Sequence, residues 1–337
     1  MSFFKNKFFY FGLALILVGI LIGFFASNYF SNQNSNNNFS SLFSDNSSEF
    51  HAGGYKFINP LYECNTGETY GTKELSVLKS NINGYINQLT ANNSVTSVSV
   101  YFRDLNTGPW FGINEHDDFA PSSLLKVPVM MAYYKLAQSN PAILTQKITY
   151  TVDPEGVIPE NFPPAHPLVK GKTYTVEQLI NQMIIGSDNV ALRLLEDNID
   201  NNQIDQVTLD LGITTATAAT PTDFMDVSEY STLFRVLYYA TYLNKDYSEK
   251  ALKLLSQAEF KLGLVEALPK NILVAHKFGE REVGDGTHQL HDCGIVYYPN
   301  HPYLLCAMTK GPNFNDLTTT IQQISHKIYN SVLQKYH

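Results

Sequence analysis

The chain has 337 residues, of which 44% are hydrophobic and 16% are charged, and its formal net charge at pH 7 is −8. This balance is typical of a folded globular protein rather than a disordered one. With no long basic run in the sequence, nucleic acid is a poor candidate for a partner. The length suits one large domain with a short additional segment.

The first predicted element is an uncharged apolar run over residues 8–26. Its length predicts a transmembrane helix. No small-x-small cleavage site follows, so we interpret the run as an uncleaved signal anchor; a cleaved signal peptide is the alternative. Lys5 and Lys7 precede the run and the next basic residue is Lys56. The positive-inside rule therefore predicts that residues 1–7 are a cytoplasmic stub and that the body lies outside the cytoplasm.

A segment rich in Ser and Asn follows the predicted anchor over residues 27–54. Such a composition buries too little apolar surface to fold, which predicts a flexible tether. Folding signals resume at Tyr55, so residues 55–337 are expected to form the folded domain. This organisation predicts a single-pass protein of the cell membrane, and we expect it to be monomeric.

The body contains helical and strand-like patterns in a definite order. Apolar spacing predicts helices over residues 73–90, 122–138, 189–198, 203–211, 223–243, 248–259 and 317–332. A further helix is expected to open at Thr175, where Thr175-x-x-Gln178 is a capping-box pattern. Strands are predicted over residues 95–105, 110–114, 272–279, 291–299 and 302–309. Strands from both ends of the chain would have to share one sheet around an inserted helical block, which is an α+β arrangement.

Three cysteines are present, Cys64, Cys293 and Cys306, and none belongs to a Cys-x-x-Cys pair that would indicate zinc. Cys293 and Cys306 flank a predicted turn near Asn300, so they are expected to lie close together. We favour two buried thiols for this pair. A disulfide is the alternative if the domain lies outside the cytoplasm.

The predicted helix over residues 122–138 begins with Ser123-Leu-Leu-Lys126 and is apolar on nearly every face. A serine hydroxyl is a weak nucleophile until a base takes its proton. Residues i and i+3 share one helix face, so the Lys126 amine is expected within reach of the Ser123 hydroxyl. Burial lowers the pKa of a lysine, so Lys126 is a candidate base for nucleophilic catalysis by Ser123.

Two further motifs follow, Ser187-Asp188-Asn189 and Lys277-Phe278-Gly279. Ser187 is a candidate proton relay to a leaving nitrogen, and Asn189 offers an amide to a substrate amide. Lys277 would place a second cation on a strand beside the nucleophile, and that strand can donate a backbone N–H to an oxyanion hole. Each motif alone is weak, because Ser-Asp-Asn also suits a helix N-cap and Lys-x-Gly is common. The three in this order are far more specific.

With these motifs, residues 60–337 resemble the class A β-lactamase and penicillin-binding protein superfamily. Other matching stretches are Thr220-Pro-Thr-Asp-Phe-Met225 and Met308-Thr-Lys-Gly311. The resemblance implies a helical lobe packed on an antiparallel sheet with flanking helices, with the active-site cleft between them. It implies a covalent acyl-enzyme on Ser123 and oxyanion donors at the N–H groups of Ser123 and Glu280. It also implies proton transfer by Lys126 and Ser187, and substrate orientation by Asn189, Lys277, Gly279 and Glu280.

The chain departs from the family pattern in the omega-loop region. Class A β-lactamases carry there a glutamate that activates the deacylating water, but no Glu occurs between Glu196 and Glu229. A β-lactam acyl-enzyme is therefore expected to persist. Asp223 is the nearest acid; we interpret it as part of a helix start rather than as a catalytic residue.

The third motif departs as well, because Phe278 stands where the family has a Thr or Ser hydroxyl that binds the substrate carboxylate. Strand alternation predicts that Phe278 and Glu280 both point into the cleft, where Glu280 would repel a carboxylate. Arg281 is the candidate to compensate for this loss, whereas Cys293-Gly294 stands where several family members have Arg-Gly and so removes another cation.

No metal or other cofactor is expected. His276, His288, His291 and Cys293 form only a thin ligand pattern, and surface or hydrogen-bonded histidines are the favoured interpretation.

We expect a serine hydrolase or acyltransferase that is acylated by β-lactams or by D-Ala-D-Ala-type cell-wall peptides. A true class A-like β-lactamase is the alternative within the enzymes. A non-catalytic module that binds a β-lactam or a peptide is the alternative of another class.

Overall fold

The computed structural model describes residues 49–51, 54–64, 73–215, 219–283 and 285–336. The predicted anchor and most of the predicted tether lie outside these residues, so both stay predictions. Across the described ranges, no helix is long and apolar enough to cross a membrane. All that follows concerns the unit Ser47–His337.

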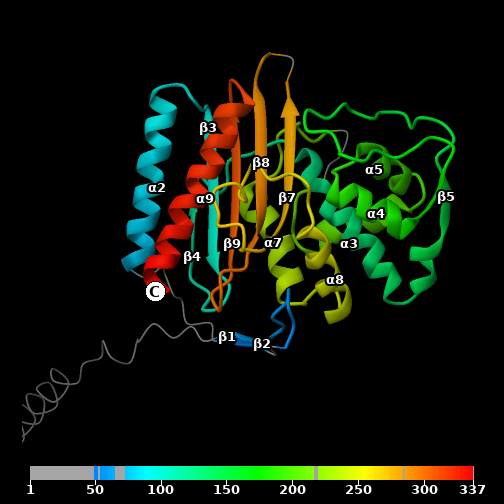
Figure 1. Cartoon of the computed structure of the whole chain (residues 1–337), viewed down its shortest axis with the longest axis horizontal. Helices are drawn as coiled ribbons and strands as arrows, with labels where there is room; N and C mark the ends of the chain where they lie inside the picture. The colour runs from blue at the N-terminus through cyan, green and yellow to red at the C-terminus, as the bar shows by residue number, and fades with distance from the viewer. Residues whose placement is uncertain (1–48, 52–53, 65–72, 216–218, 284, 337) are drawn as a thin grey trace, which may run out of the picture. The chain divides into compact units, whose positions relative to one another are not determined.

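An antiparallel five-stranded sheet has the strand order β4-β3-β9-β8-β7 (Figure 1). Its strands are β3 (Ser97–Asp104), β4 (Trp110–Ile113), β7 (Val274–Glu282), β8 (His288–Val296) and β9 (Tyr303–Gly311). In the pairing of β3 with β9, Ser97 lies opposite Lys310. The expectation that strands from both ends of the chain share one sheet is confirmed, and β7 lies at one edge.

Helices α2 (Lys73–Ala91) and α9 (Phe314–Tyr336) cover one face of this sheet (Figure 1). Each was predicted from apolar residues three or four positions apart, and those residues are buried against the sheet. They are Leu75, Leu78, Ile82 and Ile86 on α2, and Leu317, Ile321, Ile324, Ile328 and Val332 on α9.

The helical lobe is inserted between β4 and β7 and forms a second apolar core. Its helices are α3 (Lys126–Ala137), α4 (Val176–Ile185), α5 (Asn189–Glu196), α6 (Asn201–Asp210), α7 (Val227–Tyr238) and α8 (Lys245–Leu255). The predicted capping box is present, because the Thr175 hydroxyl accepts the Gln178 N–H while the Gln178 side chain accepts the Thr175 N–H. Helix α3 is buried on nearly every face, as its sequence indicated.

Short elements complete the unit. Two small antiparallel pairs join β1 (Glu49–His51) to β2 (Leu61–Cys64) and β5 (Lys147–Thr149) to β6 (Thr173–Thr175). Single 3₁₀ segments are η2 (Ser122–Leu125) and η3 (Pro141–Thr145).

The predicted start of the helix over residues 223–243 is wrong by several residues. Helix α7 begins only at Val227, because the Asp226 carboxylate accepts the Glu229 N–H at 2.6 Å and caps the helix there. Asp223 lies before the helix and binds Lys310 instead, at 2.8 Å.

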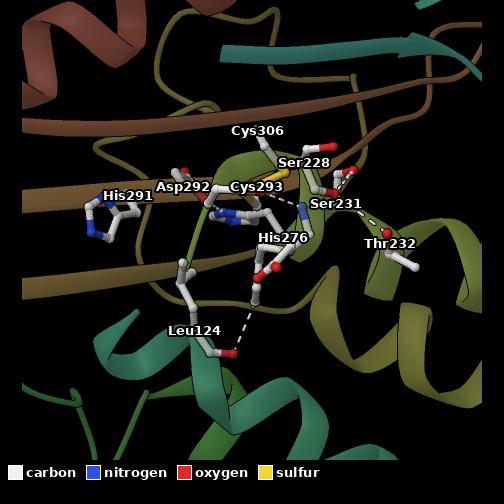
Figure 2. The surroundings of a disulfide bond; sticks show 12 residues. Leu124, Ser228, Ser231, Thr232, His276, His291, Asp292, Cys293 and Cys306 are labelled. Atoms are coloured by element: carbon white, nitrogen blue, oxygen red, sulfur yellow. Dashed lines mark hydrogen bonds and ion pairs between the residues drawn. A yellow bond between two sulfur atoms is a disulfide. The ribbon is translucent and has the colours of Figure 1, made fainter. Parts of the chain in front are cut away.

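The preference for two thiols at Cys293 and Cys306 is also wrong, because these residues form a disulfide (Figure 2). They lie directly opposite each other on β8 and β9, with a Cα–Cα distance of 4.0 Å. Facing positions of adjacent antiparallel strands come this close, so the turn between the strands suffices to bring the sulfurs together.

Replacing Cys293 and Cys306 together with Ala should lower the free energy of unfolding by about 2–4 kcal/mol, since the bridge restricts the unfolded chain. The measurement is urea unfolding with and without dithiothreitol. Reductant should destabilise the wild type and a Cys64→Ala control, but not the double variant. A wild-type midpoint that ignores reductant would contradict the bridge.

Candidate active site

The candidate nucleophile lies in the 3₁₀ turn that leads into α3. Ser123 is the second residue of η2, and Ser122 before it has a positive φ of 49°. Lys126 opens α3, and its Nζ lies 2.9 Å from Ser123 Oγ. The contact expected from the i, i+3 spacing is therefore present.

Lys126 is fully buried and is held by acceptors from another segment. Its Nζ donates to the carbonyl oxygen of Ser187, to Ser187 Oγ at 3.2 Å and to Asn189 Oδ1 at 2.6 Å. Burial lowers the pKa of Lys126 to about 8, although the nearby carboxylates of Glu160 and Asp188 oppose the shift. An appreciable fraction of this amine is neutral in mildly alkaline solution.

The second motif occupies the junction between α4 and α5. Ser187 has a positive φ of 58°, and the Asp188 carboxylate caps α5 by accepting the Ala191 N–H at 2.8 Å. The expected N-cap role of this motif is confirmed. The junction places Ser187 Oγ between two amines, Lys126 at 3.2 Å and Lys277 at 2.8 Å.

Lys277 projects from β7 toward this junction and is fully buried. Its Nζ also donates to the Phe278 carbonyl oxygen at 3.0 Å. Burial lowers the pKa of Lys277 well below its ordinary value, and the neighbouring charge of Lys126 lowers it further. Two amines and two hydroxyls thus form one hydrogen-bonded network across three elements.

Gly279 allows β7 to pack closely against η2, the 3₁₀ turn that holds Ser123. A Cβ at this position would lie 2.8 Å from the Pro121 carbonyl oxygen and 3.0 Å from Leu124 Cγ. Such close approach requires glycine. The strand therefore runs directly beside Ser123, as the third motif suggested.

Phe278 does not point into the cleft, so that prediction is wrong. Its ring is buried and stacks on Phe260 with centroids 4.0 Å apart, within the core under α9. The Lys277 amine reaches Ser187, whereas the neighbouring Phe278 ring packs with Phe260 instead.

Glu280 lines the cleft as predicted, but its carboxylate binds backbone N–H groups of the protein itself. Its Oε1 accepts the N–H groups of Asn161 at 2.7 Å and Phe162 at 2.9 Å. Its Oε2 is buried and has no hydrogen-bond partner among the described residues.

Residues 150–172, here called the strap, reach the site, although no motif in them predicted it. The strap links β5 to β6 and contacts both walls of the cleft. On the helical side, Asn189 Nδ2 donates to the Ile158 carbonyl oxygen at 2.7 Å, and the Asn189 N–H donates to Glu160 Oε1 at 2.8 Å. A connection of this length between two short strands is itself a signal of a functional loop.

A cavity of about 410 Å³ opens beside Ser123, within the range of small-molecule sites. Its lining includes Ser123, Asn189, Glu280 and Arg281, and the strap contributes Ile158 and Glu160. Ser123 of the first motif, Asn189 of the second, Glu280 directly after the third, and the strap therefore meet around one cavity.

Asp223 and the histidines considered as metal ligands make hydrogen bonds within the fold. Burial alone would raise the pKa of Asp223, but hydrogen bonds from Lys310 and Gln289 lower it below its ordinary value. His276 Nδ1 lies 2.8 Å from the Asp292 carboxylate beside the disulfide (Figure 2). His291 Nε2 lies 3.0 Å from the Ala120 carbonyl oxygen, and His288 Nδ1 lies 3.1 Å from the Gly286 carbonyl oxygen.

Comparisons with solved structures agree with this fold. PBP-A aligns with a TM-score of 0.64 at 21% identity, covering 76% of this chain and 97% of that chain. A beta-lactamase from Chitinophaga pinensis aligns with a TM-score of 0.65 at 20% identity, covering 75% of this chain and 99% of that chain.

Comparisons of sequence extend the likeness beyond the fold. The beta-lactamase VEB-1 of Pseudomonas aeruginosa is 25% identical over an alignment of 233 residues, and the alignment covers 64% of this chain and 76% of that protein. The model of the beta-lactamase enzyme family matches residues 79–332, which contain all three motifs. The chain therefore belongs to the beta-lactamase enzyme family.

Proposed function

We propose that this family member is a serine hydrolase or acyltransferase that forms a covalent acyl-enzyme on Ser123 with β-lactams or D-Ala-D-Ala-type peptides. The observation that carries the proposal is the 2.9 Å contact between Ser123 Oγ and the buried amine of Lys126. A hydroxyl paired with a base of lowered pKa, at the edge of a cavity, is the arrangement that nucleophilic catalysis needs.

In the proposed acylation, neutral Lys126 accepts the hydroxyl proton while Ser123 Oγ bonds to the substrate carbonyl carbon. The C=O electron pair moves onto oxygen, where the N–H groups of Ser123 and Glu280 donate to it. When the intermediate collapses, the C–N bond breaks and the leaving nitrogen takes the Ser187 hydroxyl proton. Lys126 then returns its extra proton to Ser187. Lys277 donates a hydrogen bond to the Ser187 hydroxyl and so holds it in place.

Slow deacylation of β-lactams is part of the proposal, because the sequence has no Glu between Glu196 and Glu229 to activate water. One observation favours the alternative of a hydrolysing β-lactamase, namely that Glu160 of the strap lines the same cavity as Ser123. Its Oε1 accepts the Asn189 N–H, which supports a structural role instead.

The proposed location is the outer face of the cell membrane, with residues 8–26 as the anchor. The disulfide between Cys293 and Cys306 supports an oxidising compartment for the folded domain.

Exposure of the full chain, in mild detergent, to benzylpenicillin should add the mass of one penicillin, and the adduct should persist for hours. Intact mass spectrometry follows it, with Ser123→Ala as the control that should remain unmodified. An adduct that clears within seconds would favour the β-lactamase alternative. If Glu160 then activates the deacylating water, the acyl-enzyme should persist in the Glu160→Gln variant. No adduct would favour a binding module.

The acylation rate should rise with pH through about 8, because the base must be neutral and the pKa of Lys126 is about 8. Below that pH the ammonium form predominates, so the rate should fall about tenfold per pH unit. Lys126→Arg should slow acylation by at least about 100-fold. Lys135→Arg, an exposed change on the same helix, is the matched control and should keep the wild-type profile. A flat profile would contradict Lys126 as the base.

A further inference from the structure

Residues 157–162 of the strap run across the cavity between its two walls. At one end the Ile158 carbonyl oxygen accepts from Asn189 Nδ2, on the helical side. At the other end the N–H groups of Asn161 and Phe162 donate to Glu280 on β7. Since Ile158 and Glu280 both line the cavity that holds Ser123, this stretch forms a roof over it.

Phe162 adds an apolar fastening to the same end of the roof. Its ring packs edge-on against Phe260, Phe278 and Phe314, with centroid distances of 5.2, 6.1 and 5.5 Å. Phe278 thus supplies a docking surface for the strap at the position where a hydroxyl was expected. Aromatic edge contacts of this kind stabilise a loop beyond the area they bury.

The Glu280 carboxylate is the polar fastening of this end. One oxygen accepts two backbone N–H groups, and hydrogen bonds to a charged acceptor are stronger than neutral ones. Removing the carboxylate leaves the Asn161 and Phe162 N–H groups without this partner.

The position of the Ile158 carbonyl determines which part of a substrate the roof would restrict, namely its acyl group. The family resemblance implies that Asn189 orients the substrate, and we take its Nδ2 to donate to the amide carbonyl of the acyl group. Ile158 already takes that bond, so a substrate must displace it and then pass its acyl side chain between the strap and β7. The Glu280 carboxylate joins the strap to β7 on that side of the cavity.

We propose that the Glu280 side chain is a specificity-determining residue, which ties the strap over the cleft and selects substrates with small acyl groups. This inference rests on the proposed function. Glu280 acts through the strap rather than on the reacting atoms, and its backbone N–H keeps the separate role described above.

The test compares two penicillins with the same ring carboxylate, benzylpenicillin and the bulkier piperacillin, on the full chain in detergent. The measured quantity is the ratio of their acylation rate constants. Glu280→Ala should raise the piperacillin-to-benzylpenicillin ratio about tenfold, which corresponds to about 1.4 kcal/mol. Glu280→Gln keeps one acceptor oxygen and should shift the ratio less. Glu282→Ala, on the same strand and cavity, is the matched control and should leave the ratio unchanged.

A structural defect would slow acylation by both penicillins alike and leave the ratio of their rate constants unchanged. An unchanged ratio in Glu280→Ala therefore overturns the inference, although the adducts would still support the acyl-enzyme. Equal shifts in Glu280→Ala and Glu282→Ala overturn it as well. No adduct in any variant overturns the proposed function and this inference together.

Hydrogen exchange gives an independent readout: the Asn161 and Phe162 amides should be protected in the wild type and lose protection in Glu280→Ala. Unprotected wild-type amides would mean that the fastening does not form.

Discussion

The burial of the Lys126 amine is the constraint on which the rest of the site depends. A buried amine without water is stabilised by a lowered pKa and by hydrogen-bond acceptors, and Lys126 has both. Its acceptors come from the nucleophile turn and from the junction between α4 and α5, while Lys277 binds the same Ser187 hydroxyl from β7. Three elements that are distant in sequence are therefore held together by one polar network. Such a network tolerates little displacement of any member.

Much of this arrangement was predictable from the residues alone, for identifiable reasons. Helices α2 and α9 follow from apolar spacing, and the network follows from three motifs whose geometry is largely local. The direction of Phe278 was mispredicted, because alternation does not show which way a side chain turns on an edge strand: the Phe278 ring packs on Phe260, whereas Glu280, two residues further on, lines the cavity. The strap was missed because its contacts at Glu160 and Phe162 are made by backbone groups and by a partner more than a hundred residues away. The disulfide depends on strand register, which a pattern of cysteines does not supply.

The substitutions that set this chain apart from the family pattern act together in the structure. Phe278 and Glu280 lie two residues apart on one face of β7, and Phe162 of the strap contacts both, one through its ring and the other through its N–H. Considered singly, each change removes a feature of substrate recognition. Considered as a pair, they hold a segment of the chain beside the nucleophile. In the family pattern, the first of these positions binds the substrate carboxylate. In this chain, both positions bind the strap instead.

The order of strands in the sheet has a consequence for biogenesis. β3 is hydrogen-bonded on one side to β4 and on the other to β9, with Ser97 opposite Lys310. The first hairpin of the five-stranded sheet to be synthesised, β3–β4, therefore exposes an unpaired edge until nearly the whole chain has been made. Non-local pairing of this kind is slow and leaves strand edges open to aggregation. If the domain is exported as proposed, threading it unfolded through a translocation channel would postpone this pairing until the C-terminal strands emerge, so secretion and folding would be coupled in time.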